Sequence, residues 1–97
     1  MARLQVMNPV ARSRAEAVKP AGRAGDLGRK TVGLYWNMKA GGDVALDRTA
    51  ELLTRRYPGL ALRRFQGSVG QNIKHLTGED ADRIARECQA VVATTAD

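Results

Sequence analysis

Apolar and polar positions alternate along residues 30–97 in a pattern that predicts five regular segments. The run Lys30–Trp36 is almost continuously apolar, which is typical of a strand covered on both faces. A helix is predicted after it, because apolar residues recur on one side at helical spacing until Pro58-Gly59 ends the pattern. Asp43 stands where the N-cap of this helix is expected. The apolar stripe consists of Leu46, Ala50, Leu53 and Tyr57.

A second strand is predicted over Leu60–Phe65, although Arg63-Arg64 interrupts its apolar character. A partly solvated strand of this kind belongs at the edge of a sheet. After a loop, the sequence Thr77-Gly78-Glu79-Asp80 resembles a helix capping box with Asp in place of the usual Glu, so a second helix is expected to begin there. A final apolar run over 90–95 predicts a buried strand. The expected buried face of the second helix consists of Ala81, Ile84, Ala85 and Cys88.

The order strand-helix-strand-helix-strand predicts an α/β fold in three layers, because each connection is long enough for parallel pairing. The two most apolar strands, the first and the third, are expected to lie side by side in the interior, with the Arg-bearing second strand outside. This gives the spatial order 2-1-3, the front half of a flavodoxin- or Rossmann-like parallel sheet. Residues 30–97 are therefore expected to form one α/β domain that is incomplete at its C-terminal side.

Residues 1–29 are expected to form an irregular arm, because Pro20 and several glycines are scattered among Arg and Ala. Within this arm, Leu4–Pro9 resembles a short strand that runs into a turn. Basic charge is concentrated here: residues 1–30 contain seven Lys or Arg and two acidic residues, whereas the remainder contains nine and eight. No aromatic residue is interleaved with the arginines of the arm, so nucleic-acid binding is not favoured. A solvated or partner-binding arm is the simpler interpretation.

A chain of 97 residues that is 43% apolar suffices for one domain with a thin core. Cys88 is the only cysteine, which excludes an internal disulfide and fits a reducing, cytoplasmic compartment. Its place on an apolar helix face indicates a core residue rather than a nucleophile. No run approaches the roughly 20 apolar residues of a membrane span, and no secretory signal is evident. The Arg- and Ala-rich start also fits an organellar transit peptide in composition, although an amphipathic presequence would not need a strand-like segment.

Open α/β sheets bind ligands outside the carboxyl ends of their strands, where the strand order reverses. In the order 2-1-3 this point lies between the first and third strands. A crevice for a small molecule is therefore expected between residues 37–43 and whatever follows Thr95. The residues predicted to bind a ligand there are Asn37, Lys39, Asp43, Ser68, Thr95 and Asp97.

The loops that carry these residues also have plainer explanations. Residues 37–43 lead into a helix N-terminus, where backbone N–H groups favour an anion and Lys39 adds positive charge. Gly41-Gly42 is also explained as a tight strand-to-helix turn. Residues 67–72 are small enough for close approach of a ligand, or are simply solvated. His75 has no Cys, Asp or Glu at metal-ligand spacing, so no metal site is predicted.

Stretches spread over essentially the whole chain resemble the UGSC-motif family of selenoproteins and their cysteine homologues. In that family, a strand similar to 90–95 leads through an Asp, here Asp97, into selenocysteine (or cysteine)-Gly-Ser-Cys. The stretches that carry the resemblance are Leu4–Pro9, Gly28–Lys39, Ala45-Leu46, Ala50–Leu53 and Cys88–Val92.

The resemblance implies selenol or thiol redox chemistry on a small-molecule substrate, because the family is related to the selenoprotein subunits of glycine and betaine reductases. The reactive motif is expected directly after Asp97, so no catalytic residue is expected within this chain. No cofactor is implied apart from the selenocysteine of the full-length protein. Since UGA encodes selenocysteine and is also read as a stop codon, the chain is expected to be the N-terminal part of a longer protein and to be inactive alone.

A second hypothesis remains open at this point. The chain would then be a small non-catalytic α/β subunit or interaction module that completes its sheet with a partner chain or a second copy. Its last strand would offer a bare edge, which favours association. The codon after Asp97 separates the two hypotheses: UGA followed in frame by Gly-Ser-Cys favours the first, and UAA or UAG favours the second.

Overall fold

Strand β1 (Thr31–Trp36) is the centre of the sheet in the computed structural model, which describes residues 3–95. Within those residues the sheet has three strands, all parallel, in the order β2-β1-β3. Strand β2 (Ala61–Phe65) pairs with β1 so that Thr31 lies opposite Ala61. Strand β3 (Ala90–Thr94) pairs with the other side of β1, with Val32 opposite Ala90. The predicted α/β class and the strand order 2-1-3 are therefore confirmed.

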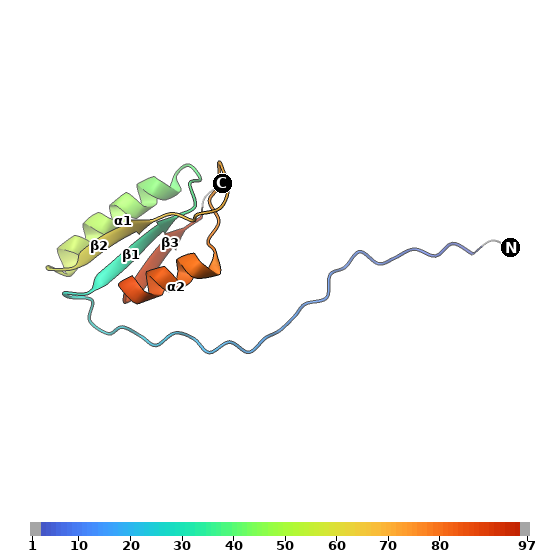
Figure 1. Ribbon diagram of the computed structural model, residues 1–97, viewed down its shortest axis with the longest axis horizontal. Helices are drawn as coiled ribbons and strands as arrows, with labels where there is room; N and C mark the ends of the chain where they lie inside the picture. The colour runs from blue at the N-terminus through green and yellow to red at the C-terminus, as the bar shows by residue number, and fades with distance from the viewer. Residues whose placement is uncertain (1–2, 96–97) are drawn as a thin grey trace.

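The two helices cover opposite faces of this sheet (Figure 1). Helix α1 (Gly42–Arg56) connects β1 to β2, and helix α2 (Gly78–Glu87) connects β2 to β3. Successive side chains of a strand point to opposite faces, so alternate residues of β1 contact α1 and α2. The result is the three-layer arrangement that the pattern of the sequence predicts.

The core is small and lies on both faces of β1. On the α1 side, Val32, Leu34 and Leu46 are each 1% exposed. A second cluster lies on the α2 side, where Gly33 allows close contact, since a Cβ there would lie 3.1 Å from the Phe65 ring and 3.2 Å from Cys88 Sγ. Cys88 is buried, as predicted. The second cluster consists of Phe65, Ile84 and Cys88, with Tyr35 packed against it.

Helix α1 begins two residues earlier than predicted. Gly41 is its N-cap, with a left-handed φ of 94° and no side-chain cap, so the prediction of Asp43 as the N-cap is wrong. Only glycine adopts that backbone conformation without strain, and the chain therefore turns into the helix at Gly41. Asp43 lies in the first turn instead, where the positive end of the helix dipole stabilises its negative charge.

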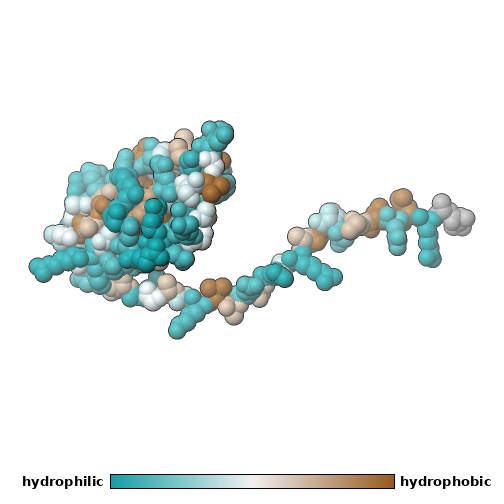
Figure 2. All heavy atoms as spheres, in the orientation of Figure 1, coloured by the Kyte–Doolittle hydropathy of each residue, from teal (hydrophilic) through white to brown (hydrophobic). Residues whose placement is uncertain are grey.

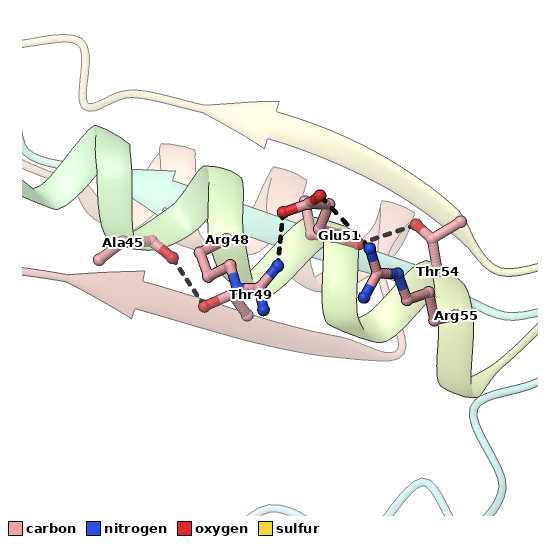
Figure 3. A network of polar contacts seen from close by, with 7 residues as sticks. Ala45, Arg48, Thr49, Glu51, Thr54 and Arg55 are labelled. Carbon is pink, nitrogen blue, oxygen red and sulfur yellow. Dashed lines mark hydrogen bonds and ion pairs between the residues drawn. The ribbon is translucent and has the colours of Figure 1, made fainter.

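The outer face of α1 is polar and carries its own network of contacts (Figure 3). Glu51 accepts from Arg48 at 2.9 Å and lies 3.7 Å from Arg55. The hydroxyls of Thr49 and Thr54 donate to carbonyl oxygens one turn earlier. These exposed pairs contribute little stability, so the helix depends on its buried side for its position.

Helix α2 begins with the capping box that the sequence predicts. The Thr77 hydroxyl accepts from the backbone N–H of Asp80 at 3.1 Å, and the Asp80 carboxylate accepts from the backbone N–H of Thr77 at 3.1 Å. Ile84 is buried as expected. Ala85 is exposed, contrary to prediction, because it faces the open side of the domain next to β3.

The two edges of the sheet differ in charge. Arg63 of β2 pairs with Glu87 at 2.9 Å, and Arg64 pairs with Asp47 at 2.7 Å, which confirms β2 as a charged edge strand. Strand β3 contains no charged residue, and it has a neighbour on one side only within residues 3–95. Its Val91 is 47% exposed, so the prediction of a buried final strand is wrong for this part of the chain.

The N-terminal arm extends away from the domain and accounts for a longest dimension of 76 Å (Figure 1). Residues 3–27 contain no helix or strand, so the short strand expected over Leu4–Pro9 is not formed. A strand requires a hydrogen-bonded neighbour, and this segment has none beside it. Leu4 and Met7 are instead 91% and 95% exposed. Hydrophobic and hydrophilic residues both occur along the extended arm (Figure 2). Neither helix formed by the described residues has the length and apolar character needed to cross a membrane.

Candidate functional site

A groove of about 430 Å³ lies at the carboxyl edge of the sheet. It is bounded by the residues that follow β1, by the end of β3 and by the loop 66–77 before α2. This is the place between the first and third strands where the strand order reverses, and open α/β sheets bind their ligands there. We refer to it below as the carboxyl-edge groove.

The structure brings three of the six predicted ligand residues to this groove: Asn37, Lys39 and Thr95. Asp43 instead lines a separate cavity of about 300 Å³ beside Leu34, Trp36 and Leu46, on the α1 side of the sheet. Asn37, Lys39 and Thr95 lie together because β1 and β3 are adjacent and parallel, so that their carboxyl ends meet at the same edge of the sheet. That they bind a ligand remains a prediction.

Ser68 does not line the groove. The backbone N–H and the hydroxyl of Ser68 both donate to Asp80 Oδ2, at 3.1 and 2.6 Å, so Ser68 anchors its loop to α2. Asp97 lies outside the described residues. Residues 67–72 do not line the groove, so the structure gives no support to the prediction that a ligand approaches them closely.

The turn from β1 into α1 is held by hydrogen bonds at each step. Trp36 Nε1 donates to the carbonyl of Lys39 at 2.8 Å, and the Lys39 backbone N–H donates to Asn37 Oδ1 at 3.2 Å. Thr94 Oγ1 donates to the carbonyl of Gly42 at 3.1 Å, which joins the end of β3 to the first residue of α1. The tight turn predicted from Gly41-Gly42 is confirmed, since a Cβ at Gly42 would lie 2.8 Å from Thr94 Oγ1.

The loop 66–77 folds back over the end of β1, which the sequence did not indicate. Val69 and His75 form an antiparallel bridge, in which His75 N–H donates to the Val69 carbonyl at 2.7 Å. Lys74 is joined to the strand twice: its N–H donates to the Asn37 carbonyl at 3.1 Å, and its carbonyl accepts from Tyr35 Oη at 3.2 Å. The backbone of Lys74 is therefore fixed at the rim of the groove.

Asp80 holds the base of this loop. The Ser68 hydroxyl, together with backbone N–H groups of Thr77 and Ser68, lowers the pKa of Asp80 from 3.8 to about 2, because each donates to the charged carboxylate. Arg83 lies 4.0 Å from the other carboxylate oxygen. Asp80 is thus a positioning residue for the loop that carries Lys74.

We expect Asp80→Asn to lower the thermal midpoint by about 5 °C or more at neutral pH, because one oxygen then accepts three bonds without a negative charge. The wild-type folded state should keep the stability from Asp80 above about pH 4 and lose it as the pH falls toward 2, since the pKa is depressed to about 2 on folding. Circular-dichroism melts from pH 7 to pH 2 measure both effects.

Asp82→Asn is the matched control for this change, because Asp82 is an exposed carboxylate two positions along the same helix. It should leave the midpoint and its pH dependence nearly unchanged. Equal pH profiles for the wild type and Asp80→Asn would show that the carboxylate does not anchor the loop.

The sequence pattern did not predict five of the residues that line the groove: Tyr35, Ile73, Lys74, His75 and Leu76. Tyr35 is part of an apolar strand, and only its hydroxyl reaches the edge. The adjacent polar pair Lys74-His75 was a usable signal, because it follows the carboxyl end of a strand. Residues 3–95 contain no group of three His, Cys, Asp or Glu side chains that could hold a metal ion.

Cys88 lies at the opposite end of the domain from the groove. It follows α2, and its neighbour Gln89 is hydrogen-bonded to Thr31 at the start of β1. Burial raises the pKa of the Cys88 thiol, which keeps it protonated and unreactive. Any thiol or selenol chemistry in the groove therefore needs a group other than Cys88.

Comparison with known proteins gives one match. The model of the UGSC family matches residues 5–97, which include the α/β domain and most of the arm. Neither the curated proteins nor the solved structures yield a match to the chain.

Proposed function

The chain belongs to the UGSC family, and on that premise we propose that it forms the first half of a selenol- or thiol-dependent redox protein that acts on a small molecule. The carboxyl-edge groove would hold the substrate, with Asn37, Lys39 and Thr95 on its walls. The reactive selenocysteine (or cysteine)-Gly-Ser-Cys segment would follow Asp97. The 97 residues alone would then be inactive, because the reacting atom is outside them.

The observation that carries this proposal is the position of the end of β3. Thr94 Oγ1 is bonded to the Gly42 carbonyl at the first residue of α1, and Thr95 lines the groove. The end of β3 therefore lies beside the N-terminus of α1. A selenolate or thiolate there would be favoured by the positive end of the helix dipole.

The chemistry proposed for that segment is a reversible two-electron step. The selenol and the cysteine three residues later would close a Se–S bond, lose two protons, and pass two electrons to the substrate. An external dithiol would reopen the bond, by the exchange rules that apply to a Cys-x-x-Cys pair. This chain's own part is to orient the substrate and to position the segment.

The proposal is tested first by the coding sequence after the Asp97 codon. We expect UGA, followed in frame by codons for Gly, Ser and Cys. The full-length protein should then show one rapidly alkylated selenol at neutral pH, detected by mass spectrometry after iodoacetamide treatment, whereas Cys88 stays unmodified in the folded state because it is buried. Rapid alkylation of Cys88 alone would contradict the proposal.

A second candidate function is supported by the open edge of β3. This strand is uncharged, Val91 is 47% exposed, and an apolar surface formed by Tyr35, Leu76 and Ile84 adjoins it. The chain would then be a non-catalytic subunit that completes its sheet with a partner chain or a second copy. A UAA or UAG codon after Asp97, together with a stable oligomer in light scattering, would favour this candidate over the first.

A further inference from the structure

We propose that the carboxyl-edge groove selects a small organic anion with an apolar body, an inference that rests on the proposed function and names its substrate class. The walls of the groove combine two chemistries. The lining includes cationic and hydrogen-bonding residues, and Tyr35, Ile73 and Leu76 supply apolar surface.

Within residues 3–95, the lysines that line the groove are its charged side chains. Lys39 and Lys74 both line it, and His75 lies next to Lys74. Among the described residues, no acidic side chain lines the groove. The two nearest candidates are used elsewhere: Asp43 lines the cavity on the α1 side, and the Asp80 carboxylate accepts three hydrogen bonds from Ser68 and Thr77. An anionic head group therefore meets no repelling carboxylate among the wall residues that the structure describes.

Lys74 is the residue on which this selectivity chiefly depends. Its backbone is joined to Asn37 and Tyr35, so the lysine is held at the groove and does not move with a free loop. Its ammonium group donates one hydrogen bond to the Gly70 carbonyl at 2.6 Å. An ammonium has three donors, so two remain for a ligand.

Asn37 adds a neutral donor to the lining of the groove. Its Oδ1 accepts from the Lys39 backbone N–H at 3.2 Å, which fixes the carbonyl end of the amide. The NH₂ end is then the part of the side chain that can donate to a ligand oxygen. Thr95 provides a hydroxyl on the β3 side. The groove is thus lined by residues with an ammonium, an amide and a hydroxyl group, which suit the oxygens of a carboxylate or a phosphate monoester.

The volume of the groove is sufficient for such a ligand. About 430 Å³ lies within the range for small-molecule sites, so a short-chain acid fits. The half-exposed side chains of Ile73 and Leu76 would cover the apolar body of such a ligand.

The test is a set of NMR titrations of the 97-residue chain with hexanoate, hexyl phosphate, hexanol and hexylamine, at constant ionic strength. We expect hexanoate, hexyl phosphate or both to shift the amides of residues 37–39, 73–76 and 95. Hexanol and hexylamine should bind at least tenfold more weakly, because they lack the negative head group. Whichever anion binds more tightly assigns the head group.

Lys74→Gln should weaken binding of the anion by about tenfold, the usual effect of removing one charge-assisted hydrogen bond. Arg86→Gln is the matched control, because it also removes one cation. Arg86 lies in the last turn of α2, whereas Lys74 lies in the loop before the first turn of that helix. Equal binding of hexanol and hexanoate, absence of binding by either anion, or equal loss in both variants would overturn the inference. The result is independent of the reactive segment, since the titration needs no selenium or sulfur chemistry, and the coding sequence tests that segment separately.

Discussion

We expect Leu34→Ala to reduce the free energy of unfolding by about 3 kcal/mol, a large part of the roughly 5 kcal/mol that a small domain has. Leu34 is 1% exposed, lies in the central strand, and has neighbours on both sides of β1. Its side chain packs on the face that α1 covers, so truncation removes apolar contacts between the sheet and this helix. Urea unfolding followed by the fluorescence of Trp36, the only tryptophan, measures the change.

Leu52→Ala is the matched control for this prediction. It is the same chemical change, but Leu52 is on α1 and is 48% exposed, so little apolar surface is lost from the interior. We expect its effect to remain below about 1 kcal/mol. A loss at Leu34 no greater than at Leu52 would show that the α1 side of β1 is not the main core.

The large effect follows from how few side chains hold the layers together. Among the described residues, the fully buried ones on the α1 side are Val32, Leu34 and Leu46, and the cluster on the α2 side has three more buried members. The arm adds no buried apolar residue, because its large side chains are solvated. Removing one of so few core residues therefore has a larger relative effect than in a domain of usual size.

The sequence predicted the sheet because hydrophobic pattern and charge directly determine it. The continuous apolar run at β1 indicated a central strand, and Arg63-Arg64 indicated an edge strand. The reciprocal bonds of Thr77 and Asp80 were also predictable, because a capping box depends only on neighbours three residues apart. In each case the controlling interaction is local or depends on one face of the element.

The wrong predictions concern features that depend on the three-dimensional path of the chain and not on the local sequence pattern. Asp43 is a good N-cap by residue type, but the left-handed backbone of Gly41 begins the helix earlier. The strand-like pattern of Leu4–Pro9 finds no partner, and Val91 at the edge of β3 stays half exposed. Neither local propensity nor periodicity reveals whether a neighbouring strand is present.

The candidate site was predictable in location but not in composition. The reversal of strand order located Asn37, Lys39 and Thr95 correctly at one edge. Lys74 joins them only because the loop 66–77 folds back and bonds to Asn37 and Tyr35, which are far from it in sequence. The proposed anion selectivity therefore depends on the conformation of a loop, and on the glycines that allow it.

We expect Gly67→Ala to remove the groove. This substitution tests most directly whether anion binding depends on the conformation of the loop 66–77. An added Cβ would collide with the backbone carbonyl of His75, which is rigid main chain and not a flexible side chain. The bridge between Val69 and His75 would have to open, and Lys74 would lose its fixed position beside Asn37. Overpacking against backbone costs about 2–3 kcal/mol, so the thermal midpoint should fall by about 10 °C or more.

Gly78→Ala is the control for the Gly67 change, because a Cβ at the first residue of α2 meets no atom within 4 Å. It should leave the midpoint unchanged or slightly higher, since Ala is the better helix former. The decisive reading is the pair of measurements together: Gly67→Ala must lose both stability and hexanoate binding, and Gly78→Ala must retain both. If Gly67→Ala instead kept wild-type binding of hexanoate, the groove would not be built by the folded-back loop, and the role assigned to Lys74 would be wrong.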